Sequence, residues 1–204
     1  GVDTSHPFLK NKTVGGKDFV DNDNTPNDEN SHGTHVAGTI IDCVGSANVK
    51  IMPVRVLNAK GSGSVSMVSL GIKYAANNNA DVINLSLGGR HSAVQDAAVQ
   101  YAVGKGSTVI IAAGNDNMDT SSVCPAHLTV PGTIIVSAGN SNREKAEFSN
   151  YGVNIDLMAP GASIKAAIPG GSYGSKSGTS MATPHVSAAA VLLDMVWGKS
   201  LAPA

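Results

Sequence analysis

Ser180 is the residue whose type and position most directly suggest nucleophilic catalysis. It lies between a glycine-rich stretch and an apolar helical pattern, so it falls where a helix begins. The N-terminal end of a helix offers unpaired N–H groups and a positive dipole, and both stabilise a developing oxyanion. A serine that only caps a helix is the more common occupant of such a position. The motif alone therefore leaves a nucleophile and a helix cap open.

Two histidines, His32 and His35, lie three residues apart at the start of another predicted helix. A zinc pair of the H-E-x-x-H kind needs a spacing of four and an intervening glutamate, and this stretch has neither. One catalytic and one structural histidine is the better interpretation. A metallohydrolase built on this pair stays as a third class of function, which predicts inhibition by chelators instead of serine reagents.

Asn115 follows an apolar run, in the sequence AAGN that ends a predicted strand. An asparagine at this place can cap a turn. It can also donate a hydrogen bond from its side-chain amide to an oxyanion. Taken alone, the turn is the more common role.

These residues must be positioned by elements that alternate along the chain. We predict strands at 50–57, 81–87, 108–113 and 133–138, and helices at 65–76, 92–103 and 180–196. Near-continuous apolar runs indicate strands covered on both faces. The alternation predicts a parallel sheet with right-handed crossovers, whose ligand crevice lies at the carboxyl ends of the strands. The stretch 148–178 is rich in Gly, Pro, Ser and Asn, so we expect turns to dominate there.

Composition narrows the class of protein. The chain has 204 residues, a net charge of −1 and 14% charged residues, which fits one domain over 1–204 and excludes the basic surface of a nucleic-acid-binding protein. No apolar run reaches the roughly 18 residues of a membrane span, and the first residues lack the pattern of a signal peptide. Cys43 and Cys124 could form a disulfide or remain thiols, and we favour thiols.

Considered together, the motifs resemble the subtilisin-like serine proteases. HGTHVAG from His32, NLSLGG from Asn84, AAGN ending at Asn115 and GTSMATPHV from Gly178 occur in the family's order on the expected elements. Residues 1–9 look like the family segment that follows its catalytic aspartate. The resemblance covers nearly the whole chain. It implies an α/β, three-layer fold with a central, mostly parallel sheet flanked by helices, which we expect to be truncated at both ends.

The resemblance implies a serine endopeptidase that works through an acyl-enzyme. Ser180 is then the nucleophile, His32 the general base, and Asn115 the side-chain half of an oxyanion hole completed by the Ser180 N–H. The alternative is a catalytically impaired pseudoprotease or peptide-binding module. Structural, turn or loop positions are implied for the other histidines: His6, His35, His91, His127 and His185.

The family resemblance also implies a polypeptide substrate that binds as an added strand, with a propeptide or protein inhibitor as a further possible partner. The wall of the main side-chain pocket should include residues 123–126, with Val123 near its floor and Asp116 at its rim, and should favour an apolar, medium-sized side chain. The family further implies a secreted monomer, with neither a nucleic-acid nor a membrane partner. The implied substrate-binding residues are Gly61, Ser62, Gly63, Ser86, Leu87, Gly88, Ala113 and Gly114.

An oxygen-rich stretch at 18–27 resembles the calcium loop of thermitase-type relatives. It is not an EF-hand, because it lacks both the turn glycine and the closing glutamate. A solvated acidic turn is the alternative. The second common calcium loop of the family looks shortened at 47–49, so no ion is predicted there. The implied Ca²⁺ ligands are Asp18, Asp21, Asp23, Thr25 through its carbonyl, and Asn27.

The ends of the chain depart from the family pattern. The catalytic aspartate of the family precedes the residue matching Gly1 by two positions, so we expect it outside this chain, and Asp3 does not replace it. Only 24 residues follow Ser180, fewer than in the family. We therefore expect a partial sequence whose missing central strand leaves two unpaired sheet edges. Loss of the aspartate costs about 10⁴ in kcat in related triads.

Overall fold

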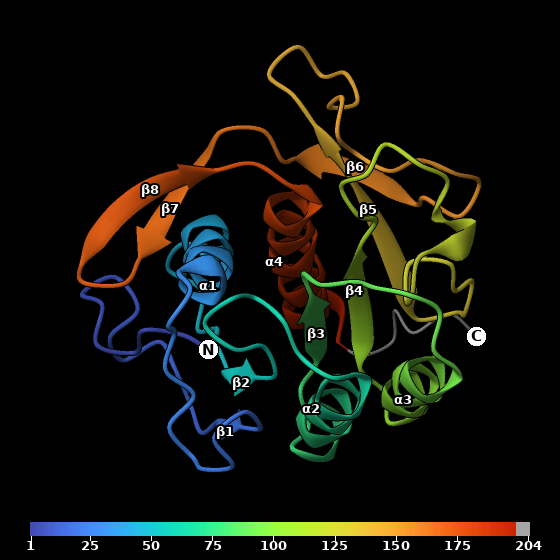
Figure 1. Cartoon of the computed structure of the whole chain (residues 1–204). Helices are drawn as coiled ribbons and strands as arrows, with labels where there is room; N and C mark the ends of the chain where they lie inside the picture. The colour runs from blue at the N-terminus through green and yellow to red at the C-terminus, as the bar shows by residue number, and fades with distance from the viewer. Residues whose placement is uncertain (199–204) are drawn as a thin grey trace.

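The computed structural model describes residues 1–198 and places a four-stranded sheet between two sets of helices (Figure 1). All neighbouring strands of this sheet run parallel, in the order β3-β4-β5-β6. The strands are β3 (Val82–Leu85), β4 (Thr108–Ala112), β5 (Thr133–Gly139) and β6 (Leu157–Pro160). The helices are α1 (His32–Val44), α2 (Val65–Asn77), α3 (Ala93–Gly104) and α4 (Thr179–Trp197). This arrangement confirms the three-layer α/β fold.

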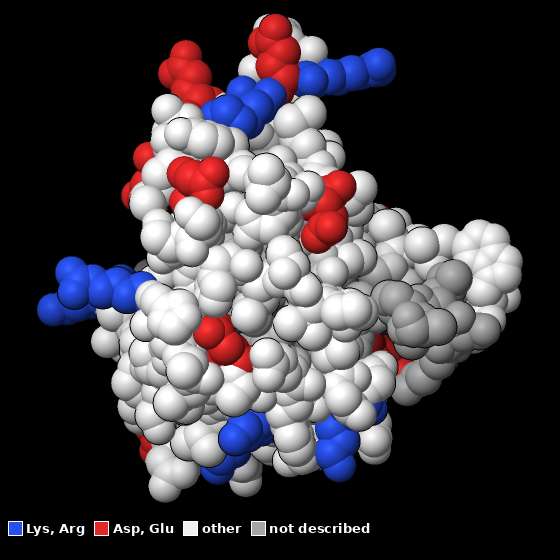
Figure 2. Space-filling view, turned by 90° about the vertical axis from the view of Figure 1, so that its right-hand side faces the viewer, with Lys and Arg blue, Asp and Glu red and all other residues white. Residues whose placement is uncertain are grey.

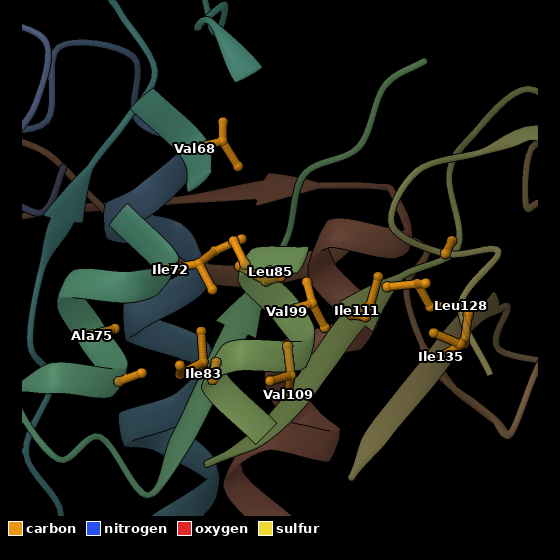
Figure 3. Close-up of a cluster of buried hydrophobic side chains, with 14 of the residues drawn as sticks. Val68, Ile72, Ala75, Ile83, Leu85, Val99, Val109, Ile111, Leu128 and Ile135 are labelled. Atoms are coloured by element: carbon orange, nitrogen blue, oxygen red, sulfur yellow. The ribbon is translucent and has the colours of Figure 1, made fainter. Parts of the chain in front are cut away.

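The central strand β4 shows why the sheet needs helices on both faces. Val109 and Ile111 point into a cluster with residues of α2 and α3, whereas Ile110 points into a second cluster with residues of α4 (Figure 3 shows the first). All three side chains are fully buried. Successive residues of a strand face opposite sides, so a strand covered twice is apolar at every position.

Helix α1 does not contact the four-stranded sheet through its core side chains but packs on α4. Ala37 and Ile41 of α1 share a buried cluster with Ala188 of α4 and with Leu9 near the N-terminus. At Gly38 the helix approaches β7 so closely that a Cβ would lie 3.0 Å from the Ala167 side chain. The two helices that carry the candidate catalytic residues are therefore fixed side by side (Figure 1).

Two smaller sheets and one short helix complete the described fold. Strands β1 and β2 are parallel, and β7 and β8 form an antiparallel hairpin over α1. Within residues 1–198, β2 pairs only with β1, and β3 pairs only with β4. Both therefore present an unpaired edge. The remaining elements are β1 (Lys17–Asp18), β2 (Val54–Arg55), η1 (Thr120–Ser122), β7 (Ile164–Ile168) and β8 (Ser172–Lys176).

Most predicted elements are confirmed within one or two residues, but two regions differ. The strand predicted at 50–57 is reduced to Val54–Arg55 and a single bridge from Ile51 to Thr13, since Pro53 has no N–H for a ladder. The stretch expected to be dominated by turns holds β6, β7 and β8. The β7–β8 hairpin turns at Gly170 and Gly171, both with positive φ, so glycines that signalled loops in fact join strands.

The molecular surface carries few charges on the face shown in Figure 2, where acidic and basic side chains are scattered. This distribution agrees with the net charge of −1. None of the helices within the described part of the chain has the length and apolarity that crossing a membrane requires.

Candidate active site

The start of α4 is tied to the end of β3 by a reciprocal pair of hydrogen bonds. The Ser180 hydroxyl donates to the Ser86 carbonyl at 3.2 Å, and the Ser86 hydroxyl donates to the Ser180 carbonyl at 2.9 Å. The Asn84 amide donates to the Ser86 hydroxyl at 2.9 Å. The candidate nucleophile is thus joined directly to the segment predicted to bind substrate.

Asn115 lies beside the same helix start with its amide held in one orientation. Its Oδ1 accepts the backbone N–H of Thr179 at 2.8 Å and the Thr179 hydroxyl at 3.0 Å. The Thr179 hydroxyl in turn accepts the backbone N–H of Gly114 at 3.1 Å. Because Oδ1 faces two donors, Nδ2 is left as the free donor end of the amide.

Gly178 separates the two candidate oxyanion donors. A Cβ at this position would lie 3.6 Å from Nδ2 of Asn115 and 3.7 Å from both Oδ1 of Asn115 and the backbone N of Ser180. Both donors therefore lie next to one small volume that glycine leaves open. An oxygen placed there can accept hydrogen bonds from the side chain and the helix start together, as an oxyanion hole requires.

His32 is the first residue of α1 and is organised by a carboxylate that precedes the helix. Asp28 Oδ1 accepts the backbone N–H groups of Asn30 and Ser31, and Oδ2 accepts the N–H and the hydroxyl of Thr34, all at 2.6–2.9 Å. Ser31 adopts a left-handed conformation with φ of 79° and offers no side-chain cap of its own. Asp28 therefore supplies the missing cap.

The electrostatic environment keeps the His32 imidazole neutral. Burial and then the positive charge of Lys176 lower the pKa of His32, and these effects outweigh the raising effect of Asp28. Within residues 1–198, His32 forms no hydrogen bond with Ser180 or with a carboxylate. The lowered pKa favours the neutral imidazole that a general base requires. No hydrogen bond with Ser180 or a carboxylate in this part of the chain orients the ring.

Three segments predicted to wall a side-chain pocket meet at Val123. Its Cγ1 lies 3.7 Å from the Cβ position of Gly88 and 3.6 Å from that of Gly114. Gly89 and Cys124 exchange two backbone hydrogen bonds, at 2.9 and 3.0 Å. These bonds hold the substrate segment at 86–88 against the segment at 123–126. The other substrate segment, residues 61–63, is exposed and closes a turn onto Asn58.

Comparison with known proteins decides the family. The model of the subtilase family matches residues 1–198. The chain belongs to the subtilase family. Its structure superposes with a TM-score of 0.92 on the crystal structure of a cold adapted subtilisin-like serine proteinase, at 44% identity over 98% of this chain and 74% of that one.

Curated subtilases show the same relationship in sequence. Subtilisin amylosacchariticus from Bacillus subtilis subsp. amylosacchariticus is 45% identical over 203 residues, which is 95% of this chain and 53% of that protein. Thermitase from Thermoactinomyces vulgaris is 45% identical over 203 residues, 95% of this chain and 71% of that protein. The chain thus spans about half the length of the first of these relatives.

Three supporting residues of this subtilase were missed by sequence reasoning. Asp28 caps α1, Thr179 orients Asn115, and the buried Asn150 shapes the loop after β4. Asn150 donates to the Ala113 carbonyl at 2.9 Å and accepts the N–H of Asp116 at 2.9 Å. A carboxylate four residues ahead of a predicted helix could have signalled Asp28. No local signal marks Asn150, because its contacts lie more than 30 residues away.

The predicted calcium loop of this subtilase is closed by an arginine. The buried Arg55 guanidinium pairs with Asp18 at 2.8 Å, with Asp21 at 2.7 Å and with Glu29. The other oxygen of Asp18 accepts the N–H groups of Val20 and Asp21, at 2.7 and 3.0 Å. Burial alone would raise the pKa of Asp18, but these donors hold it below its usual value.

The loop at 18–27 does not present a preformed set of Ca²⁺ ligands. Asp21, Asp23, Thr25 and Asn27 are exposed, and Oδ1 of Asp23 accepts the N–H of Thr25 at 2.7 Å. Ca²⁺ takes six to eight oxygen ligands. Asp18 and Asp21, two of the five implied ligands, are both paired to Arg55.

The zinc pair proposed for His32 and His35 receives no support from their surroundings. His35 is fully buried, and its Nε2 faces the carbonyl oxygens of Ile164 at 2.9 Å and Gly174 at 3.1 Å. Nε2 between two carbonyls must donate, so this nitrogen has no lone pair for a metal. Nδ1 keeps its lone pair but is buried without a hydrogen-bond partner. The two cysteines are free thiols, with Cys43 exposed and Cys124 buried.

Proposed function

We propose that this protein is a serine endopeptidase that cleaves peptide bonds through an acyl-enzyme on Ser180. One observation carries the proposal: Nδ2 of Asn115 and the backbone N–H of Ser180 flank the same volume at Gly178. Donors aimed at a common point before substrate arrives stabilise charge that develops in the transition state. Membership of the subtilase family supports the same function.

In the proposed reaction, neutral His32 accepts the proton of Ser180 as its oxygen attacks the scissile carbonyl. The carbonyl oxygen then becomes negative and accepts hydrogen bonds from Asn115 and from the start of α4. His32 next donates its proton to the leaving amine, and water repeats the sequence to release the acyl group. The hydrogen bond from the Ser180 hydroxyl to Ser86 must first break, so that the hydroxyl can turn toward His32.

We further propose that the chain as given is catalytically impaired. No carboxylate within residues 1–198 hydrogen-bonds His32, and the hydrogen bonds that Asp28 accepts come from Asn30, Ser31 and Thr34. An unpartnered histidine loses its orientation and the stabilisation of its protonated form. Removing the aspartate of a related triad costs about 10⁴ in kcat and leaves measurable residual activity.

Substrate is proposed to bind as an added strand along residues 61–63 and 86–88. The exposure of the first segment and of Gly88, and the partial exposure of Leu87, support this site. Val123 gives the adjoining pocket an apolar surface between Gly88 and Gly114. A cleavage profile with a medium-sized apolar residue before the scissile bond is expected, and a preference for Lys or Arg would contradict it.

The proposed partners follow from the same site. A propeptide or protein inhibitor would use the substrate strand positions, and the net charge of −1 does not favour a nucleic acid. We propose a secreted monomer that has no membrane partner, on the strength of the family alone.

A peptide-binding pseudoprotease is the second candidate, favoured by the absence of a His32–Ser180 hydrogen bond within residues 1–198. A fluorophosphonate probe separates the two, because it reacts only with an activated serine. Intact mass should show slow labelling that Ser180→Ala abolishes. A chain that binds peptide but stays unlabelled after long exposure would contradict the endopeptidase.

We propose that Ca²⁺ binds in the loop at 18–27 only if it displaces the Arg55 guanidinium from Asp18 and Asp21. The family supports the ion, whereas the pairs from Arg55 to Asp18 and Asp21 occupy two of the implied ligands. If the exchange occurs, the melting temperature in Ca²⁺ should exceed that in a chelator. An unchanged melting temperature would contradict calcium binding in this loop. Arg55 would then be the permanent counter-charge of Asp18 and Asp21.

A further inference from the structure

Three metal-ligating side chains converge behind the pocket wall, outside the active site. Nε2 of His91 lies 3.4 Å from Oδ2 of Asp96, and Nε2 of His127 lies 3.3 Å from the same oxygen. The three candidate ligand atoms all lie within 4.8 Å of one another. The residues come from the loop before α3, the first turns of α3 and the loop before β5, so only the fold brings them together.

We propose that His91, Asp96 and His127 form a binding site for a divalent transition-metal ion of the Zn²⁺ type. Imidazole nitrogen is a preferred ligand of Zn²⁺, Cu²⁺ and Ni²⁺, and a carboxylate oxygen completes many such sites. Ca²⁺ and Mg²⁺ prefer sets made only of oxygen, so this trio does not suit them. The proposal is independent of the proteolytic function and of the loop at 18–27.

The spacing of the donors matches a tetrahedral ion. With bonds of about 2.0–2.2 Å, neighbouring donors around tetrahedral Zn²⁺ are about 3.3–3.5 Å apart. The two nitrogen–oxygen distances, 3.4 and 3.3 Å, already have this length. Only the two imidazoles have to move closer, and the His91 side chain, 65% exposed, is free to do so.

His127 is oriented so that the nitrogen facing the cluster has a lone pair. Its Nδ1 lies 3.2 Å from the carbonyl oxygen of Val123. A carbonyl only accepts, so it favours the ring protonated at Nδ1, and a neutral ring in that form keeps the Nε2 lone pair for a metal. Metal-bound histidines usually have their other nitrogen fixed in this way.

Asp96 is oriented by a buried thiol. Cys124 donates to Oδ1 of Asp96 at 3.2 Å, which leaves Oδ2 directed at both histidines. Cys124 is fully buried, so it acts as a positioning residue and not as a ligand. Two of the three ligands thus have a supporting hydrogen bond, and the third, His91, is the exposed and movable one.

A metal at this site would brace the wall of the candidate substrate pocket. His127 and Cys124 belong to the same loop as Val123, which contacts the positions of Gly88 and Gly114. Asp96 belongs to α3, which packs on the central sheet. The ion would therefore link a rigid helix to a loop that faces substrate.

Calorimetric titration of the full chain with ZnCl₂ tests the proposal. Every protein carries Ser180→Ala to prevent autolysis, and the variants compared are His91→Gln, His127→Gln and His185→Gln. His185 is the matched control, because its Nδ1 also faces a carbonyl four residues earlier, that of Met181 at 2.9 Å. Exposed His91 can change without loss of folding, which the melting temperature without metal verifies.

One zinc ion per chain is expected, with affinity reduced about tenfold or more in His91→Gln and His127→Gln but unchanged in His185→Gln. No binding by the parent, or equal binding by all variants, would overturn the proposal. Substitution with Co²⁺ adds a spectroscopic test. Tetrahedral cobalt absorption without a thiolate band supports the ligand set, whereas a thiolate-to-cobalt band would contradict it by making Cys124 a ligand.

Discussion

The two helices that carry the candidate catalytic residues begin in opposite ways. At α1 the carboxylate of Asp28 accepts three backbone N–H groups, so the positive end of this helix is neutralised. At α4 the residue before the helix is Gly178, with no side chain, and the Ser180 N–H has no hydrogen-bond partner within residues 1–198. One helix start is closed to anions and the other is kept open.

This difference assigns a separate task to each helix start. The closed start of α1 fixes His32 in place and gives it a stable backbone. The open start of α4 retains its N–H groups for a charge that exists only during the reaction. Asn115 adds a second donor there, and its own oxygen is used up by Thr179. Disturbing α4 should therefore impair chemistry, and disturbing α1 should impair stability.

Asn115→Asp should have the largest effect, because it replaces the free amide donor by an acceptor at the open start. The Oδ1 contacts with Thr179 can persist, so folding should be retained. Loss of the equivalent kind of donor in subtilisin costs about 10²–10³ in rate. The rate of fluorophosphonate labelling should fall by at least that amount.

Asn142→Asp makes the same change of charge on the exposed loop between β5 and β6 and serves as the control. Its labelling rate should equal that of the parent. If both variants label equally fast, Asn115 is no oxyanion donor.

Gly178→Ala should fill part of the space between the two donors. The new methyl group would make ordinary contacts of 3.6–3.7 Å and displace an oxyanion. The φ of 156° at Gly178 strains any residue with a side chain, so the melting temperature must first show that the variant is folded. We expect labelling to slow about tenfold to a hundredfold. Gly106→Ala, which also places a side chain at a positive φ but has nothing within 4 Å, should leave the rate unchanged. Equal rates in the two variants would show that the open volume is not used.

Asp28→Ala should lower the free energy of unfolding by about 2 kcal/mol through loss of the α1 cap. Burial raises the pKa of Asp28, but its hydrogen bonds outweigh that effect and lower it from 3.8. Because the folded pKa is depressed, the stabilisation is present above the unfolded value and is lost as pH falls through the folded pKa. Chemical denaturation at pH 7 should show the full difference, and Asp42→Ala on the same helix should show none. A parent–variant difference that persists undiminished at strongly acidic pH would contradict the cap.

The smallest expected effect is a shift in pH dependence. The pKa of His32 lies below 6.5 because of burial and Lys176, so the acid limb of the labelling rate should have its midpoint below pH 6.5. Lys176→Gln removes a positive charge and should move this midpoint upward by less than about one unit, since solvent screens the charge. A downward shift would show that another group controls the limb.

Local pattern was enough to predict the elements that carry the chemistry. The apolar runs around Ile110 and Ile135 and the helical spacing in α2 to α4 depend on residues close in sequence, and the structure reproduces them. The motifs likewise led to His32, Asn115 and Ser180, whose catalytic roles stay predictions. Hydrogen bonds and ion pairs between residues far apart in the sequence could not be predicted from local pattern. The support at Asn150, the pairs of Arg55 and the cluster at His91 all depend on contacts between separate segments. The cap at Asp28 is local, so its carboxylate ahead of the helix was a signal that could have been used.

In the β6–β8 region, local pattern predicted the wrong structure. The glycines indicated turns throughout, whereas the structure forms strands between them. Gly170 and Gly171 join β7 to β8, and the residues on either side pair in an antiparallel ladder. Strand pairing is a tertiary event, so residues of low intrinsic preference can form strands when a neighbour supplies the hydrogen bonds.

A crystal structure of the full chain after reaction with a fluorophosphonate probe tests the central claim most directly. The account predicts phosphorus bonded to Ser180 Oγ, with one phosphonyl oxygen about 2.7–3.1 Å from both Nδ2 of Asn115 and the N–H of Ser180. An adduct on another residue, or a phosphonyl oxygen that contacts neither donor, would contradict the account.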